Sequence, residues 1–249
     1  MRSARVRPGR RAGRTAHEAR LIPLRDENPS STVPVVTRAL IAVNLAVFLY
    51  EVTLGPGLRA FLFDWGFVPV RLTLAVRYGD LPLGSAVLPV LTSMFLHGGW
   101  SHLIGNLWYL WIFGDNVEDV LGHAGFLAFY LVCGVVATLL HYLTGPIAEV
   151  PTVGASGAIA AVLGAYVAAF PRARVSTLLP LFPFFQVVPL PAFFVLGLWF
   201  LFQFVLGLGA LGASGSGGIA FWAHIGGFAA GVLVMRAFLT LRRSRVRVA

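Results

Sequence analysis

The sequence has little charge, a single cysteine and no lysine. Charged residues make up 12% of its 249 residues, whereas 57% are hydrophobic and the mean hydropathy is +0.81. This composition is too apolar for a soluble domain of ordinary makeup. One cysteine, Cys133, excludes an intramolecular disulfide and a cysteine-rich metal framework. We therefore expect a membrane-embedded protein in which Cys133 is a small core residue.

All 19 basic residues are arginines, and they cluster at the two ends and in one short loop. Nine lie at or before Arg38, two are Arg172 and Arg174, and five lie from Arg236 onward. Both tails lack the aromatic side chains that a nucleic-acid surface would interleave with its basic residues. Arginine clusters beside apolar segments mark the cytoplasmic side of a membrane. The charge therefore indicates topology, and we expect no nucleic-acid partner.

Apolar segments of near-membrane length follow a polar, basic stretch over residues 1–36, which we interpret as a cytoplasmic tail or linker. A helix needs roughly 20 residues to cross the hydrocarbon core of a bilayer. The segments predict an all-α membrane protein with a bundle of six transmembrane helices over 37–241 and a basic cytoplasmic tail at 242–249. The expected spans are 38–54, 101–120, 124–144, 155–171, 189–209 and 219–240.

Six spans place both termini on one side, which 16 of the 19 arginines would then share. Both ends are therefore expected in the cytoplasm. The segment 55–100 mixes aromatic and charged residues, and we expect an interfacial or partly embedded loop on the outer side. The loops 145–154 and 210–218 face the same side. The second, fourth and sixth spans would then begin near the outer surface.

Polar residues that could carry chemistry open these three spans. Ionisable groups inside a membrane are costly, so each needs a functional or a specific packing explanation. His102 and Asn106 open the second span, Ser156 opens the fourth, and His224 lies a few residues into the sixth. His102 and Asn106 are four residues apart, so they share one helix face, from which both could donate to an oxyanion. An interhelical polar contact is the alternative for this pair.

Small residues surround Ser156 in Gly154-Ala155-Ser156-Gly157-Ala158. They leave the hydroxyl accessible and let a neighbouring helix approach closely. The helix N-terminus adds unpaired N–H groups that suit an oxyanion. Simple packing of small residues is the alternative.

His224 is followed by Gly227 and Gly231, which form a small-residue face that could hold the sixth span against the fourth. Histidine acts as a base near neutral pH, although a proton relay or a structural hydrogen bond is equally open. No acidic residue lies at the depth of Ser156 and His224, so the two would form a dyad. Three acids, Asp115, Glu118 and Asp119, are expected as contacts at the inner end of the second span.

His97 precedes the second span, and we expect it to line a water entry. A zinc site made by His97, His102 and His224 is a further alternative. The sequence has no His-Glu-x-x-His helix, so we expect no metal.

Taken together, these motifs resemble the rhomboid family. The resemblance rests on His102-x-x-x-Asn106, on Gly154-Ala155-Ser156-Gly157 and on Ala223-His224-x-x-Gly227-x-x-x-Gly231, in this order across 38–240. The segment 22–29 also resembles the start of many bacterial members. The resemblance implies a six-helix intramembrane serine protease of the bacterial inner (plasma) membrane. Such an enzyme cleaves transmembrane segments of membrane proteins within the lipid bilayer, without metal or cofactor.

The family carries definite roles to this chain. Ser156 would attack, His224 would accept its proton, and His102, Asn106 and the Ser156 backbone N–H would hold the oxyanion. Gly154 matches the small residue two positions before the serine. The fifth span and the 210–218 loop match the family's lateral gate and cap, where a substrate helix would enter.

Two departures from the family pattern concern orientation and packing. Many members carry an aromatic residue four positions after the serine, where this chain has Ala160. The Trp-Arg pair of the first loop is also absent, and Arg71 or Arg77 near Tyr78 is no clear substitute. A catalytically inactive rhomboid-like binder of membrane proteins is an alternative function. A small transporter that uses His102 and His224 as a proton relay is another.

Overall fold

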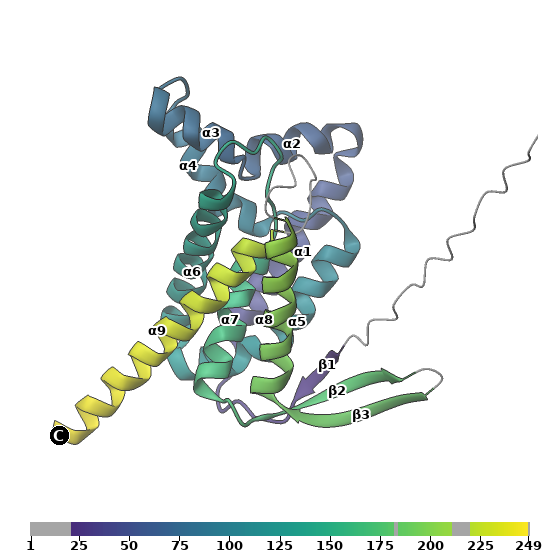
Figure 1. Cartoon of the computed structure of the whole chain (residues 1–249), viewed down its shortest axis with the longest axis vertical. Helices are drawn as coiled ribbons and strands as arrows, with labels where there is room; N and C mark the ends of the chain where they lie inside the picture. Colours follow the sequence, from purple (N-terminus) through teal and green to yellow (C-terminus); the bar gives the residue numbers. More distant parts are fainter. Residues whose placement is uncertain (1–20, 182–183, 211–219, 249) are drawn as a thin grey trace, which may run out of the picture.

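A computed structural model of the chain describes residues 21–181, 184–210 and 220–248 (Figure 1). This part of the chain is mostly helical. An α-helix accounts for most of each of the six expected spans: α1 (Val35–Thr53), α5 (Trp100–Leu121), α6 (His123–Thr144), α7 (Ser156–Ala169), α8 (Ala192–Ala210) and α9 (Phe221–Val248). By length and composition, α1, α6, α8 and α9 are long and apolar enough to cross a membrane. The expected cap, 210–218, lies outside the described residues after Ala210.

Two of the six helices differ from the usual membrane span. The C-terminal end of α5 carries Asp115, Glu118 and Asp119, which lower its hydropathy. α7 has 14 residues, a length of about 21 Å against a hydrocarbon core of about 30 Å. α9 is longer than expected and continues through Arg242 and Arg243 to Val248, so the predicted C-terminal tail continues the helix.

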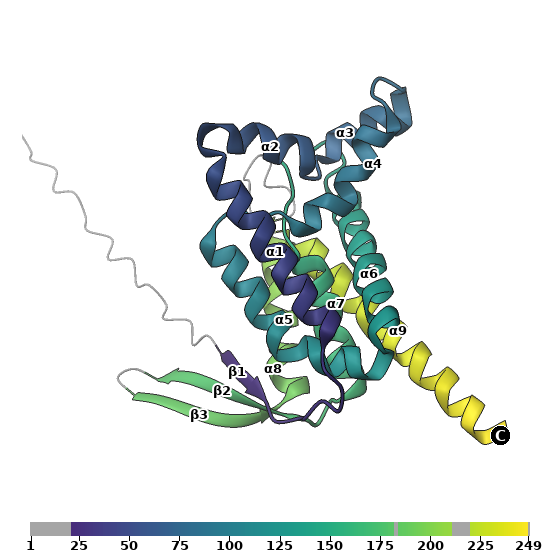
Figure 2. The same cartoon turned by 180° about the vertical axis from the view of Figure 1, so that it is seen from behind.

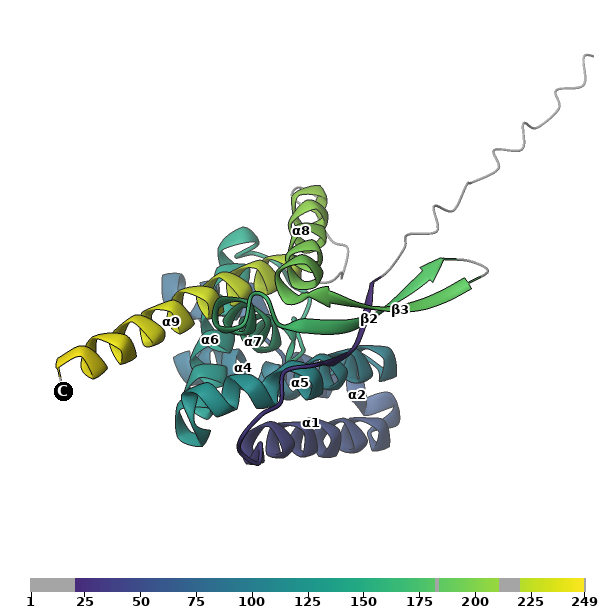
Figure 3. The ribbon, with the colours of Figure 1, turned by 90° about the horizontal axis from the view of Figure 1, so that it is seen from below.

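α7 lies in the middle of the bundle, in contact with α5, α6, α8 and α9 (Figure 3). Ten of its 14 residues are buried, from Gly157 to Tyr166. The sequence of α7 is apolar all round, which suits a helix enclosed by four neighbours. The small side chains of α7 therefore set how closely its neighbours approach.

Glycines bring the backbones of α7 and α9 into direct contact. A Cβ atom at Gly227 or Gly231 would overlap the carbonyl oxygen of Gly157 or Ala161, and one at Gly164 would overlap that of Phe228. No side chain stands between the two helices at these points. This contact fixes the start of α9 against the start of α7.

The segment expected as an interfacial loop folds into short helices at one end of the bundle (Figures 1 and 2). They are α2 (Leu58–Trp65), α3 (Pro69–Thr73) and α4 (Leu83–Thr92). Phe67, Leu72, Ala86 and Val90 form their own small buried cluster. The guanidinium of Arg71 donates to the Phe63 carbonyl and joins α2 to α3. Arg71 thus has a structural role in this loop, although the Trp-Arg pair is missing.

A three-stranded antiparallel sheet lies at the other end of the bundle, and it departs from the all-α expectation (Figure 1). Its order is β1 (Ile22–Asp26), β2 (Arg174–Leu181) and β3 (Phe184–Pro191). Ile22 lies opposite Leu178, and Arg174 lies opposite Pro191. The sequence did not indicate this sheet because the prolines of β2 and β3 looked like a loop and β1 lies far away in the chain. The stretch 1–36 is therefore not a tail throughout.

The acids at the C-terminal end of α5 hold the N-terminal segment in place. The buried Glu118 carboxylate accepts from the backbone N–H groups of Val36 and Thr37, at 2.9 and 2.8 Å. These N–H groups belong to the first turn of α1, which has no side-chain cap of its own. Asp119 accepts from Ser31 and Thr32. Glu118 therefore caps α1 from a neighbouring helix.

Candidate active site

Ser156 and His224 form a hydrogen bond between α7 and α9. Ser156 Oγ lies 2.8 Å from His224 Nε2. Ser156 is the first residue of α7, half-buried, and His224 is the fourth residue of α9, 8% exposed. The glycine contact between the two helices begins one residue after the serine and three residues after the histidine. The close approach of the backbones therefore brings these two side chains together.

The other ring nitrogen of His224 is held by α8. His224 Nδ1 lies 2.8 Å from Gln203 Oε1, and the Trp199 ring lies beside the imidazole with centroids 5.9 Å apart. An amide oxygen only accepts, so Nδ1 carries the proton and Nε2 accepts from the serine hydroxyl. Sequence reasoning missed both residues. The available signal was that Gln203 is the one polar, non-aromatic side chain of α8, a costly residue in a membrane.

His102 presents a defined N–H group beside the serine. The Gly98 backbone N–H donates to His102 Nδ1 at 3.3 Å, so Nε2 carries the proton. A Cβ atom at Gly154 would lie 2.6 Å from His102 Nε2 and 3.6 Å from Ser156 Oγ. Gly154 also has φ +126°, in the region that favours glycine. The imidazole N–H and the serine hydroxyl thus border one small space that glycine keeps open.

Asn106 lies one turn after His102 on α5. It is 7% exposed, and its Nδ2 finds no acceptor within the described part of the chain. A buried donor without a partner costs about 1–3 kcal/mol, so it calls for a functional explanation. Together with His102 it offers two N–H donors from one helix face.

His97 lies inside the protein beside His102. It is 1% exposed, and the two rings meet edge to face with centroids 5.2 Å apart. Its backbone N–H donates to both oxygens of the buried Glu51 carboxylate at 3.2 Å. Its ring nitrogens have no hydrogen-bond partner among the described residues. That it lines a water entry stays a prediction.

The zinc alternative does not fit this geometry. Both nitrogens of His224 are engaged by Ser156 and Gln203, which leaves His97 and His102 alone. In residues 21–181, 184–210 and 220–248, no group of three or more His, Cys, Asp or Glu side chains is arranged to hold a metal ion.

Ala160 leaves the imidazole without an aromatic neighbour from α7. It is fully buried, and its Cβ faces α9, 3.3 Å from where a Gly227 Cβ would lie. A large ring at 160 would push α9 away from α7. Trp199 instead places an aromatic ring beside His224 from the other side, on α8.

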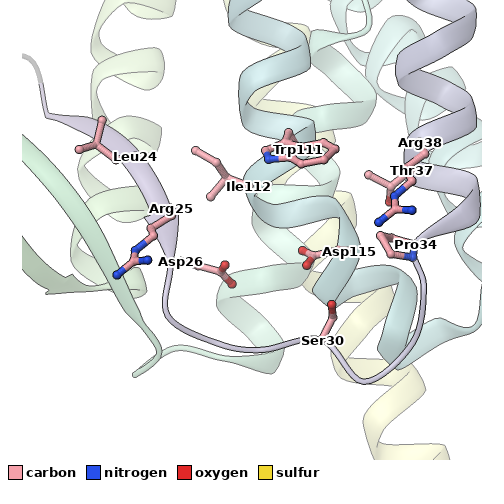
Figure 4. Close-up of a pocket in the computed structure, with 10 residues that line it drawn as sticks. All are labelled: Leu24, Arg25, Asp26, Ser30, Pro34, Thr37, Arg38, Trp111, Ile112 and Asp115. Carbon is pink, nitrogen blue, oxygen red and sulfur yellow. The ribbon is translucent and has the colours of Figure 1, made fainter.

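A cavity of about 240 Å³ lies elsewhere, between β1, α1 and α5 (Figure 4). Arg25, Asp26, Arg38, Trp111 and Asp115 line it. Trp111 and Asp115 are about 14 and 20 Å further along α5 than His102, so this cavity is separate from Ser156. Burial raises the pKa of Asp26 to about 6 despite a hydrogen bond of 2.8 Å from the Tyr166 hydroxyl.

These observations define a helical membrane protein with a serine and a histidine paired at the starts of two closely packed helices. Comparison with known protein families identifies the family of this chain. Residues 85–241, more than half of the chain, match the family description "Rhomboid domain". The chain therefore belongs to the rhomboid family, as the motifs predicted.

Curated relatives agree with this assignment. The chain is 36% identical over 133 residues to the presenilin-associated rhomboid-like protein, mitochondrial, of Bos taurus. The aligned region covers 51% of this chain and 35% of the bovine protein. It is 29% identical over 220 residues to rhomboid protein 1, mitochondrial, of Saccharomyces cerevisiae, covering 85% and 56%. Rhomboid-like protein 11, chloroplastic, of Arabidopsis thaliana is 46% identical over 68 residues, covering 27% and 24%. The chain thus spans about a third of the bovine relative and just over half of the yeast one. These names refer to organelles, so they do not support the bacterial part of the expected location.

Proposed function

We propose that this chain is an intramembrane serine endopeptidase that cleaves transmembrane segments of membrane proteins with a Ser156–His224 dyad. The observation that carries the proposal is the 2.8 Å hydrogen bond between Ser156 Oγ and His224 Nε2. Nε2 of the neutral imidazole carries no proton, because the ring proton is on Nδ1, which donates a hydrogen bond to Gln203. This is the tautomer that a general base for the serine needs.

The reaction begins with attack of Ser156 Oγ on a scissile carbonyl carbon as the hydroxyl proton passes to His224 Nε2. The negative oxygen of the tetrahedral intermediate is held by the Ser156 backbone N–H, His102 Nε2 and Asn106 Nδ2. Removing one such donor typically costs about 10²–10³ in kcat. His224 then gives the proton to the leaving amine, and water hydrolyses the acyl-enzyme by the same groups.

The site geometry suits a reaction within the membrane. We infer that α1 and α5 to α9 all cross the bilayer, and that both termini lie on the arginine-rich cytoplasmic side. α7 is about 9 Å shorter than the hydrocarbon core, so Ser156 at its start would lie below the outer surface. Water would reach it from that side, between polar helix ends.

The substrate is a transmembrane helix that unwinds near the outer face, because an intact helix shields its carbonyls with internal hydrogen bonds. α8 is the proposed gate. The side chains of Leu201, Phe202, Val205 and Leu206 are exposed along it, as expected of a lipid-facing helix. We assign the host membrane as a bacterial plasma membrane, because residues 22–29 resemble the start of many bacterial family members. The mitochondrial and chloroplast locations are those in the names of the relatives.

The test is labelling of detergent-purified protein with a fluorescent fluorophosphonate, together with cleavage of a model transmembrane substrate. Wild type should label and cleave, and Ser156→Ala and His224→Ala should do neither. Ser85→Ala, an exposed serine on α4, is the matched control and should behave as wild type. Cleavage that survives Ser156→Ala would refute the protease. Tight substrate binding without labelling or cleavage by the wild type would instead favour the inactive binder.

A further inference from the structure

The base of the proposed dyad is oriented by a helix that does not carry either member of it. Ser156 belongs to α7 and His224 to α9, yet both contacts that fix the imidazole plane come from α8. Gln203 accepts from Nδ1 at 2.8 Å, and Trp199 flanks the ring. No acidic side chain among the described residues bonds to His224.

The rest of the surroundings leaves this task to α8. Ala160 of α7, packed against α9, offers only a methyl group. The Ser156 hydroxyl cannot fix the tautomer of His224 by itself. A hydroxyl can donate to a bare Nε2 or accept from a protonated one. Only an acceptor at Nδ1 decides that Nε2 is the basic nitrogen.

We propose that Gln203 is the positioning residue for His224, filling with a neutral amide the place where other serine hydrolases use a carboxylate. This rests on the proposed protease function. When His224 takes the serine proton, its Nδ1–H bond to Gln203 becomes charge-assisted and strengthens. Gln203 therefore stabilises the imidazolium without placing a charge in the membrane, which would be costly there.

The position of Gln203 makes the base depend on how α8 sits against α9. The bond joins two helices, and N–H···O hydrogen bonds in proteins keep their donor and acceptor atoms within about 2.7–3.2 Å. A shift of α8 by much less than one helical turn would therefore break it. Gly207, four residues further along α8, packs against Phe221 and Ile225 of α9 and holds this end of the contact.

Two substitutions of nearly the same volume test the proposal in the full-length protein. Gln203→Met keeps the shape but removes the acceptor, and Gln203→Glu keeps an acceptor and adds a charge. Leu143→Met, at a 70% exposed position of α6 outside the proposed site and gate, is the control. The readouts are kcat, KM and the pH dependence of kcat/KM for a fluorogenic transmembrane substrate, with the fluorophosphonate labelling rate as a substrate-free measure. Protection of the buried Cys133 thiol shows that each variant is folded.

Gln203→Met should lower kcat and the labelling rate by about 10- to 100-fold with KM within about twofold, since a hydrogen bond to a charged group is lost. The acid limb of the kcat/KM profile of Gln203→Met should move to lower pH, because the His224 imidazolium loses its hydrogen-bond acceptor. Gln203→Glu should retain most of kcat and move the acid limb to higher pH, because a carboxylate favours the imidazolium. If Gln203 had only a structural role, the acid limb of both variants would stay at the pH of the wild type.

Unchanged kcat and an unchanged acid limb in Gln203→Met would overturn the proposal, and so would equal losses in the Met and Glu variants. If Gln203→Met fails to fold, the direction of the limb in Gln203→Glu decides. Ser156→Ala in the same assay separates the two levels. Cleavage by Ser156→Ala would refute the proposed serine protease. An inactive Ser156→Ala together with a fully active Gln203→Met would refute only the proposed role of Gln203.

Discussion

Replacing Gly227 by alanine tests the backbone contact between α7 and α9. The added Cβ would overlap the carbonyl oxygen of Gly157, and it would lie 3.3 Å from the Cβ of Ala160. A carbonyl oxygen belongs to the backbone and cannot turn aside as a side chain can. The two helices would have to separate by about 1 Å, and overpacking of this kind costs about 1–3 kcal/mol.

The same displacement should damage the chemistry more than the fold. His224 is three residues before Gly227, so it moves with α9 while Ser156 stays with α7. A misplacement of about 1 Å in a catalytic group can cost about 100-fold in rate. We expect Gly227→Ala to unfold at a temperature several degrees lower and to react with a fluorophosphonate about 100-fold more slowly.

The single cysteine supplies the stability assay. Cys133 is 1% exposed, so a thiol-reactive dye reports unfolding during a thermal ramp in detergent. Gly197→Ala in α8 is the matched control, because its Cβ would meet nothing within 4 Å. It should raise stability by up to about 1 kcal/mol, since alanine is the better helix former. Equal melting temperatures and labelling rates for Gly227→Ala and wild type would refute the contact as described.

Three further changes have defined outcomes. Because burial raises the pKa of Asp26 from 3.8 to about 6, the folded protein binds that proton more tightly than the unfolded chain does. The stability of wild type relative to Asp26→Asn, measured by thermal unfolding, should be greatest below pH 3.8 and decline as the pH rises through about 6. Glu118→Gln leaves the first turn of α1 with a weaker, neutral cap and should cost about 1–3 kcal/mol, while exposed Asp64→Asn should cost nothing measurable. Gly154→Ala places a methyl group against His102, the proposed oxyanion donor, and should lower fluorophosphonate labelling at least about 100-fold; labelling at the wild-type rate would contradict this.

The positions of the helices could be predicted from sequence because a membrane leaves the backbone few choices. Within lipid, each segment must satisfy its own hydrogen bonds, so an apolar stretch of sufficient length becomes a helix. α6 begins and ends within one residue of its predicted span. The rhomboid family could be recognised because the short motifs around His102, Asn106, Ser156 and His224 resemble those of the family and occur in the same order, and residues 85–241 match its description.

The parts that were missed depend on contacts between distant segments. β1 finds its partner strand about 150 residues later, and neither strand alternates clearly enough to signal a sheet. Gln203 stands out in the sequence as a polar residue in an apolar helix, but only the packing of α8 against α9 shows that it lies next to His224. The acids at the C-terminal end of α5 were expected as helix-end contacts, but only the packing of α1 shows that Glu118 caps the backbone N–H groups of Val36 and Thr37.

The pairing of Ile22 with Leu178 constrains the order in which the elements of the fold can assemble during synthesis. A ribosome adds about 5–20 residues per second, so β1 waits on the order of 10–30 seconds before its partner strand exists. Through that time α1, α5, α6 and α7 are synthesised while the N-terminal segment has no sheet to join. β1 is therefore among the last elements to reach its place, and a chain whose sheet has closed has already synthesised α1, α5, α6 and α7.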